Sequence, residues 1–231
     1  PVFRAEPSDT VRHLTEIGML DAEMAYIDGA EDLRGMLEEV VRAALGSVRR
    51  SLTEAENPLA DGLPELAAPF PRIPFETAEA WLGRPGAERD FGTEDEKAIG
   101  ARVEREYGTP FYYLTDFPTA VKEKTFYARR QDENPARTSY FDLEFRGLEI
   151  ASGGPREHRI DRLLENLHRG GFDPAAFPGY LEAFRFGMPP TAAGGSGSTV
   201  WSRRSPGSRT SGRHAYFPGT ATGSTRSGRR C

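Results

Sequence analysis

The chain has 231 residues, a formal net charge of −5, 37% hydrophobic and 28% charged side chains, which is enough for one globular domain with a hydrophobic core. No stretch approaches the roughly 18 consecutive apolar residues of a membrane span, and the N-terminal residues lack the pattern of a signal peptide. A single cysteine, Cys231, excludes an internal disulfide framework and a cysteine-based zinc site. We therefore expect a protein of the reducing cytoplasm.

The charge is divided unevenly along the chain. Residues 191–231 contain seven arginines and no lysine or acidic residue, so they carry +7 and residues 1–190 carry −12. The C-terminal segment consists largely of Gly, Ser, Thr and Arg and offers little to bury. We therefore expect a folded domain in residues 1–190 and a disordered basic tail in residues 191–231.

The first half of the domain predicts two strands and a helix. Val2–Glu6 alternates with period two and predicts a strand, and Glu23–Ile27 predicts a second. Apolar residues between Leu33 and Val48 recur at helical spacing, which predicts an amphipathic helix on one side of a sheet. The proline-rich residues 58–74 predict a connector.

The second half adds elements of both kinds. The sequence predicts strands over residues 111–115 and 141–152, a helix that a capping box opens at residue 93 and that ends near 107, and helices that begin at the prolines 155 and 174. Strands and helices do not alternate regularly. This order predicts an α+β fold, an antiparallel sheet flanked by helices.

Two pairs of residues near the N-terminus are the first candidates for chemistry. Arg4 and Glu6 share a strand face. They could form a salt bridge, or Arg4 could grip a phosphate while Glu6 accepts a hydrogen bond from an amine. Arg12 and His13 lie in a polar loop, where a histidine is usually solvated.

Acidic residues on the predicted strand 141–152 are candidate metal ligands. Asp142 and Glu144 share a face, and Glu149 joins them only if Gly147 introduces a bulge. Carboxylates beside the hydroxyl of Ser152 would offer oxygen ligands suited to magnesium. The alternative is a solvated strand face.

Arg156 is a candidate anion-binding residue. It follows Gly153-Gly154-Pro155 at a predicted helix start, where backbone amides favour an anion, although a surface position is equally compatible with the sequence. The glycine pair lacks the spacing of a phosphate-binding loop or of a dinucleotide-binding fingerprint.

Taken in order, these segments resemble one family. Phe3-Arg4-Ala5-Glu6 and the residues 10–16 and 20–27 are similar to motif 2 of class II aminoacyl-tRNA synthetases in its aspartate/asparagine form. Residues 141–159 and 180–190 resemble archaeal-type, non-discriminating aspartyl-tRNA synthetases. The resemblance covers residues 2–190 and implies the antiparallel catalytic core of that family from motif 2 onward.

The resemblance implies a nucleotide-binding role for the N-terminal candidates. Arg4 would be the catalytic residue, holding the α-phosphate of ATP and stabilising charge as the aspartate carboxylate attacks it. Glu6 would read the adenine amino group. Arg12 and His13 would contact the terminal phosphates of ATP or the acceptor end of the tRNA.

The resemblance also implies the metal and amino-acid sites. Asp142, Glu149 and Ser152 match the family's magnesium site, and Arg156 matches the arginine that pairs with the aspartate side chain in a bidentate fork. A family lysine that helps to bind the same carboxylate corresponds to Lys124 as first choice and Lys122 as second.

The implied cofactors are ATP and Mg²⁺, and the implied partners are aspartate and tRNA-Asp or tRNA-Asn. The reaction would be ATP-dependent activation of aspartate to aspartyl-adenylate, followed by transfer to tRNA. The intact family forms homodimers. Two alternatives stay open: a paralogue that makes asparagine from aspartate through the same adenylate, and a non-catalytic gene remnant.

Several parts of the family pattern have no counterpart in this sequence: the anticodon-binding OB domain, the dimer-forming motif 1 and the amino-acid loop upstream of motif 2, and motif 3 after Pro190. Shifting the reading frame by one nucleotide from Thr191 permits a full motif 3 through Ser202, and the family's typical ending further on. We therefore expect a truncated core whose residues 191–231 are a frameshift product, and which does not charge tRNA in this form.

Overall fold

The structure is a computed structural model that describes residues 1–3, 16–66 and 69–197. The strands are β1 (Val2–Phe3), β2 (Glu16–Ile17), β3 (Met19–Ala25), β4 (Arg72–Pro74), β5 (Phe111–Thr115), β6 (Phe141–Phe145), β7 (Glu149–Pro155) and β8 (Thr191–Gly197). The helices are α1 (Ala30–Glu54), α2 (Phe75–Trp81), α3 (Thr93–Tyr107), α4 (Ile160–Arg169) and α5 (Pro178–Arg185), with short 3-10 turns at Pro58–Ala60 and Pro174–Ala176. In the described part of the chain, no helix is long and apolar enough to cross a membrane.

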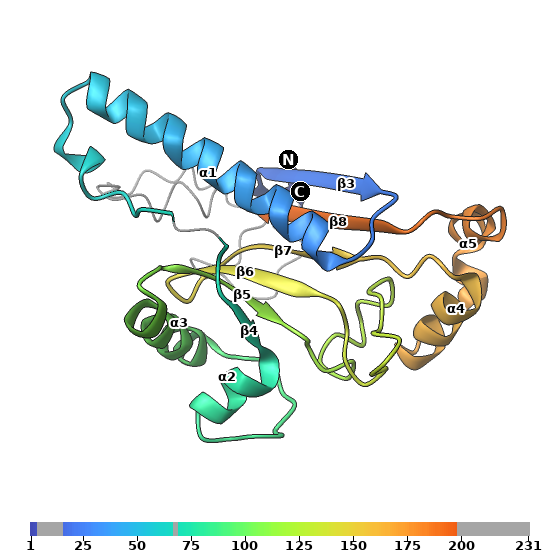
Figure 1. Ribbon diagram of the computed structural model, residues 1–231. Coiled ribbons are helices and arrows are strands. Elements are labelled where there is room, and N and C mark those ends of the chain that lie inside the picture. The colour runs from blue at the N-terminus through green and yellow to red at the C-terminus, as the bar shows by residue number, and fades with distance from the viewer. Residues whose placement is uncertain (4–15, 67–68, 198–231) are drawn as a thin grey trace, which may run out of the picture.

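A six-stranded sheet in the order β3-β8-β7-β6-β5-β4 forms the centre of the structure (Figure 1). Neighbouring strands are antiparallel except β4 and β5, which are parallel. β1 and β2 form a separate antiparallel pair. The predicted fold, an antiparallel sheet flanked by helices, is confirmed.

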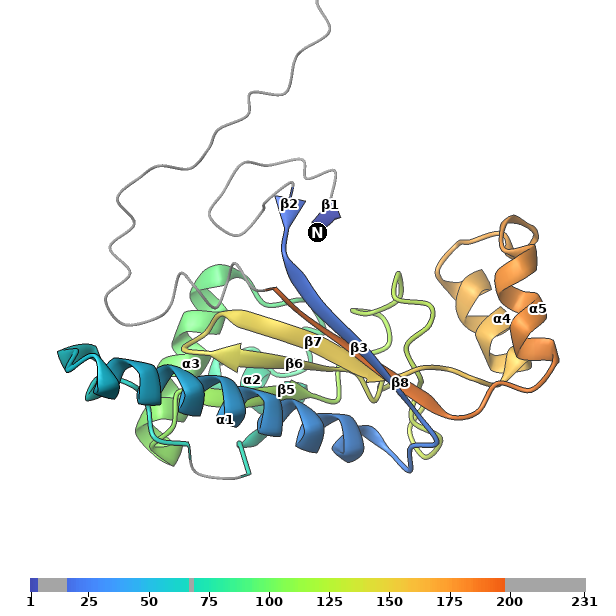
Figure 2. The same cartoon turned by 90° about the horizontal axis from the view of Figure 1, so that it is seen from above.

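One face of the sheet packs against α1 (Figure 2). Buried Leu33 and Val41 of α1 join a cluster with Tyr113, Phe141 and Leu143 of the strands. The alternation of the sequence produces this face, since every second residue of β6 points toward α1. The predicted amphipathic helix is confirmed and extends beyond its apolar stretch at both ends.

Helices of the described part of the chain cover the opposite face only partly. α2 and α3 pack over β4 and β5, where Phe75, Ile99 and Val103 meet Tyr112 and Leu114. Beyond β5, toward β3, this second face carries polar side chains. The pair α4–α5 stands at one end of the polar area, and α4 and α5 pack on each other through their own apolar cluster (Figure 2).

The predicted long strand 141–152 is wrong, because β6 and β7 form a hairpin. Its turn contains Arg146 and Gly147, both with positive φ, 51° and 69°. Two consecutive residues with positive φ match the twist of a tight hairpin turn. Gly147, considered as the site of a bulge, lies in this turn instead. The register shift lies between Leu143 and Glu144 and places Glu144 opposite Glu149.

The predicted boundary at Pro190 also needs correction. Residues 191–197, expected in the disordered tail, form β8 and pair with β3 on one side and β7 on the other. Small residues suit this place, because a Cβ on Gly153 of β7 would lie 2.5 Å from the carbonyl oxygen of Ala193. The remainder of the expected tail, residues 198–231, lies outside the described residues.

Other boundaries shift by smaller amounts. α3 spans the predicted residues, whereas the helix expected from Pro155 begins only at Ile160, because Pro155 is the last residue of β7. The proline-rich connector contains a 3-10 turn and β4.

Candidate active site

A row of paired residues, which we call the polar row, crosses four strands on the face opposite α1. Asp142 of β6 pairs with Ser152 of β7, Ser152 with Gly195 of β8, and Gly195 with Asp21 of β3. Directly paired residues of antiparallel strands project from the same face. A Cβ on Gly195 would lie 2.3 Å from the Asp21 carboxylate, which therefore lies over this glycine. The sheet thus brings two acidic side chains and one hydroxyl to one surface.

Asp142 is buried and forms an ion pair with Lys122, whose Nζ lies 3.1 Å from Oδ2. Burial raises the pKa of Asp142 to about 7; Lys122 opposes the rise and the Glu149 carboxylate adds to it. Burial alone would lower the pKa of Lys122, but Asp142, Glu149 and Asp90 raise it above its usual range. Three carboxylates therefore act on a single buried ammonium group.

This arrangement fits the predicted magnesium site. Oδ1 of Asp142 is buried and has no hydrogen-bond partner among the described residues. Ser152 lies directly across the strands, and the Glu149 carboxylate is close enough to influence Asp142. The described residues contain no cluster of three or more His, Cys, Asp or Glu that could hold a metal. Mg²⁺ commonly takes one or two carboxylates and fills its other positions with water and phosphate oxygens, so the donor set suits this ion.

Arg156 lies just after β7, on the same side of the sheet. Its backbone N–H donates to the Thr191 oxygen at 2.7 Å, and its guanidinium carbon lies 4.3 Å from the centroid of the Tyr127 ring. Nη2 is 3.7 Å from Oε1 of Glu23 on β3. The Arg156 side chain is 25% exposed and Glu23 is 67% exposed. Within the described part of the chain the guanidinium donates no hydrogen bond, so its N–H groups are available to a ligand.

The two candidate lysines occupy different places. Nζ of Lys124 donates to the Gly170 carbonyl oxygen at 2.7 Å and lies 5.6 Å from the Phe172 ring, so it links its loop to the end of α4. Lys122, the second choice, reaches Asp142. The structure therefore brings Lys122 to the polar row and does not bring Lys124 there.

The nucleotide-binding candidates Arg4, Glu6, Arg12 and His13 lie outside the described residues. Their roles stay predictions from the sequence resemblance.

Three residues at the site were not singled out from the sequence. Asp21 and Glu23 alternate on β3, and the period of two would have indicated that they share a face. Tyr127 contributes its ring to Arg156 from a loop 29 residues upstream in the chain. No local pattern indicates such a long-range contact.

Comparison with known proteins identifies the family. A family model described as tRNA synthetases class II (D, K and N) matches residues 1–199. The chain belongs to this family. The match extends past Pro190 and includes the whole of β8.

Curated relatives in the family are aspartate–tRNA ligases. The chain is 40% identical over 202 residues to the aspartate–tRNA(Asp) ligase of Thermococcus kodakarensis, covering 86% of this chain and 46% of that protein. It is 36% identical over 202 residues to the aspartate–tRNA(Asp/Asn) ligase of Methanothermobacter thermautotrophicus, covering 86% and 44%. The chain thus spans just under half the length of these relatives.

Solved structures of class II synthetases share the fold. The aspartyl-tRNA synthetase of Entamoeba histolytica matches with a TM-score of 0.75 and 32% identity, covering 85% of this chain and 41% of that one. The asparaginyl-tRNA synthetase of Pyrococcus horikoshii, complexed with asparaginyl-adenylate, matches with a TM-score of 0.71 and 27% identity, covering 85% and 46%.

Proposed function

We propose that this chain carries the aspartate-activating site of an aspartate–tRNA ligase. In the proposed reaction the aspartate α-carboxylate attacks the α-phosphate of ATP, giving aspartyl-adenylate and pyrophosphate. The aspartyl group then passes to the terminal ribose of tRNA-Asp. The observation that carries the proposal is Arg156, half-buried beside the polar row, whose guanidinium donates no hydrogen bond among the described residues and has the exposed Glu23 carboxylate 3.7 Å from Nη2.

Arg156 and Lys122 would recognise the substrate's side-chain carboxylate. A guanidinium offers two parallel N–H groups that match the two oxygens of a carboxylate. Lys122 replaces Lys124 as the proposed second cation, because its ammonium group lies in the polar row and is held in the charged form by Asp142 and Glu149.

Asp142, Glu149 and Ser152 would hold Mg²⁺ together with the phosphates of ATP. The bound ion would neutralise charge on the phosphate oxygens as pyrophosphate leaves. The protein's own contribution is to fix the oxygen donors: Asp142 is buried, and Ser152 is held across from it by the β6–β7 pairing. For Arg4, Glu6, Arg12 and His13 we keep the nucleotide-binding and tRNA-binding roles that the resemblance implies.

The charges of the site favour aspartate among the amino acids of this family. Asparagine would turn an amide NH₂ group toward donors, and lysine would bring a third cation next to Arg156 and Lys122. With either of these amino acids in the site, the polar groups of Arg156 and Lys122 would be badly paired, and such mispairing is an effective way to reject a substrate. Because some relatives act on tRNA(Asp/Asn), tRNA-Asn is a second proposed acceptor for the same aspartyl group.

Non-hydrolysable sulfamoyl analogues of aspartyl-, asparaginyl- and lysyl-adenylate test this proposal by calorimetric titration of the chain in the presence of Mg²⁺. We expect the aspartyl analogue to bind about 100-fold or more tightly than the other two. Equal affinities for all three, or preference for the lysyl analogue, would overturn the proposal.

A further inference from the structure

We propose that Tyr127 is a positioning residue that fixes the guanidinium of Arg156 for carboxylate recognition, and that Asn166 holds Tyr127 in place. The inference rests on the proposed function for its consequence, the binding of aspartate. Its geometric part concerns the arrangement of three side chains and can be tested separately.

The backbone around Tyr127 is tied to the backbone around Arg156. Glu157 N–H donates to the Tyr127 oxygen at 2.8 Å, and Arg129 N–H donates to the Pro155 oxygen at 3.0 Å. Ala128 and Arg156 form an antiparallel bridge between these two hydrogen bonds. The loop therefore cannot move away from the end of β7 without breaking this short ladder.

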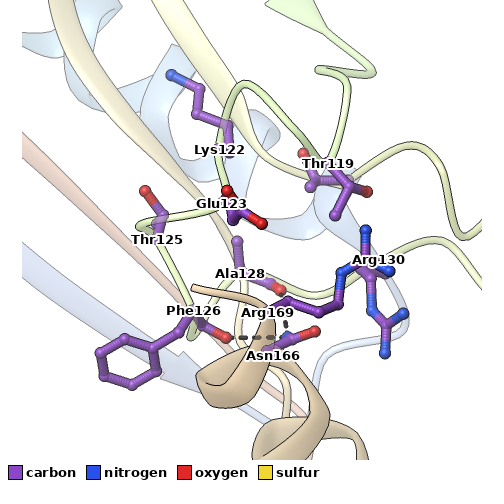
Figure 3. Close-up of a pocket in the computed structure, with 10 residues that line it drawn as sticks. Thr119, Lys122, Glu123, Thr125, Phe126, Ala128, Arg130, Asn166 and Arg169 are labelled. Carbon is purple, nitrogen blue, oxygen red and sulfur yellow. Dashed lines mark hydrogen bonds between the residues drawn. The ribbon is translucent and has the colours of Figure 1, made fainter. Parts of the chain in front are cut away.

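Asn166 of α4 holds the same segment by two hydrogen bonds to its backbone. Its Nδ2 donates to the carbonyl oxygens of Phe126 and Ala128, at 2.9 Å and 3.2 Å, in the pocket shown in Figure 3. These residues flank Tyr127 on both sides. Asn166 is only 7% exposed, and an amide group that is buried in this way is placed by its two acceptors. The Tyr127 segment is thus held between α4 and β7.

Side-chain packing also fixes the position of the Tyr127 ring. Phe126 packs edge-on against the Tyr127 ring at 5.4 Å and also contacts Phe172 and Phe177 of the α4–α5 cluster. With its ring position determined, Tyr127 presents a face to the Arg156 guanidinium at 4.3 Å. A cation held over an aromatic face is attracted by the negative potential of the ring.

The consequence is an oriented guanidinium. The Arg156 guanidinium carbon lies over the Tyr127 ring, 4.3 Å from its centroid, while Glu23 approaches Nη2 at 3.7 Å from an exposed position. Stacking on a ring leaves the in-plane N–H groups free, and these are the groups that a carboxylate needs for two parallel hydrogen bonds. Lysine has no planar group that could be oriented in the same way. Tyr127 would therefore act on substrate affinity through Arg156.

The test begins with NMR of the Arg156 guanidinium in the 231-residue chain, assigned by its loss in Arg156→Lys. We expect upfield ring-current shifts in the wild type and in Tyr127→Phe, and their loss in Tyr127→Leu. Asn166→Ala should reduce the shift, because the ring stays but its segment is released. The matched control is Tyr107→Leu, a change at an exposed tyrosine of α3. An unchanged shift in a folded Tyr127→Leu variant would overturn the inference.

Calorimetric titration of L-aspartate provides the second readout. Tyr127→Leu should weaken aspartate binding about 10-fold, whereas Tyr127→Phe should retain it. Unchanged affinity in Tyr127→Leu would contradict the positioning role. If the wild type shows the ring-current shift but binds no aspartate, the proposed function fails while the positioning geometry stands.

A third variant covers the case in which Tyr127→Leu does not fold. Pentafluorophenylalanine at position 127 keeps the volume of the ring but reverses the potential of its face. We expect faster hydrogen exchange of the Arg156 guanidinium protons than in Tyr127→Phe, and equal exchange rates would overturn the inference.

Discussion

The two faces of the central sheet are built from the same strands but have opposite character. On β6, Phe141 and Leu143 point toward α1 and are fully buried in an apolar cluster, whereas Asp142 between them points to the polar row. On β7, Gly153 lies on the α1 side and Ser152 on the polar side. Because successive side chains of a strand point to opposite faces, neighbouring residues either stabilise the fold or are proposed to bind ligands.

The two faces differ in how their buried groups are compensated. The Asp142 carboxylate is buried outside the apolar core and pairs with Lys122, while its backbone is held on both sides by β5 and β7. Burying a carboxylate is unfavourable, so we expect the apolar face to supply most of the free energy of folding. Substitutions on the two faces should therefore have separable effects on stability and on binding.

The largest effect is expected on the α1 face. Phe141→Ala removes a ring that is 0% exposed and packs edge-on against Tyr113 at 5.3 Å. We expect a loss of about 3–5 kcal/mol in the free energy of unfolding, measured in urea. The control is Phe186→Ala, because Phe186 is 84% exposed. Similar losses in both variants would contradict the assignment of Phe141 to the core.

On the polar face, stability should depend on pH through Asp142. Its pKa rises from 3.8 to about 7 on folding, mainly through burial. Between these values the folded state binds a proton that the unfolded state lacks, so the free energy of unfolding should fall as pH rises, by up to about 1.4 kcal/mol per pH unit.

The check is a set of urea transitions between pH 4 and 8, with Asp142→Asn as the control. The asparagine cannot titrate, and this contribution to the slope should disappear. Added Mg²⁺ should stabilise the wild type more at pH 8 than at pH 5, because the ion needs the ionised carboxylate. A wild-type profile parallel to that of Asp142→Asn would show that Asp142 keeps an ordinary pKa.

Substitutions at two glycines, one on each face, should have smaller effects on the free energy of unfolding. In Gly153→Ala the new Cβ would meet the backbone oxygen of Ala193 at 2.5 Å, so β7 and β8 must move apart at a cost of about 1–3 kcal/mol. In Gly195→Ala it would meet the Asp21 side chain at 2.3 Å, which can rotate away, and the cost should stay below about 0.5 kcal/mol. Thermal melts of the two variants measure the difference, and a reversed order would contradict the face assignment.

Local signals predicted much of this architecture. The alternation within residues 141–145 is a short-range pattern and located β6. The capping box expected at Thr93 located the start of α3 to within one residue, because the N-cap is Gly92 and its N–H donates to Asp95. The turn between β6 and β7 was missed because Arg146 adopts positive φ, a conformation that its residue type does not indicate.

β8 was missed for a different reason. Its residues Thr191–Gly197 have the composition of a linker, and their strand structure comes from pairing with β3 and β7, which lie far away in the sequence. The candidate site shows the same limit. Arg156 and Asp142 were candidates from their local sequence and received their roles from the resemblance, whereas the contacts of Arg156 with Tyr127 and Glu23 depend on tertiary structure.

The binding of L-aspartate to the wild type, Arg156→Leu and Arg156→Lys tests most directly whether the polar face recognises aspartate through Arg156. Loss of the guanidinium would leave the substrate carboxylate without its planar partner, and we expect Arg156→Leu to weaken binding by several kcal/mol, about 100-fold or more. Arg156→Lys keeps the charge and should lose less. Calorimetric titration, with L-asparagine as the competing ligand, should show a preference for aspartate that Arg156→Leu abolishes. An Arg156→Leu protein with unchanged aspartate affinity would show that the polar face does not recognise aspartate through this residue.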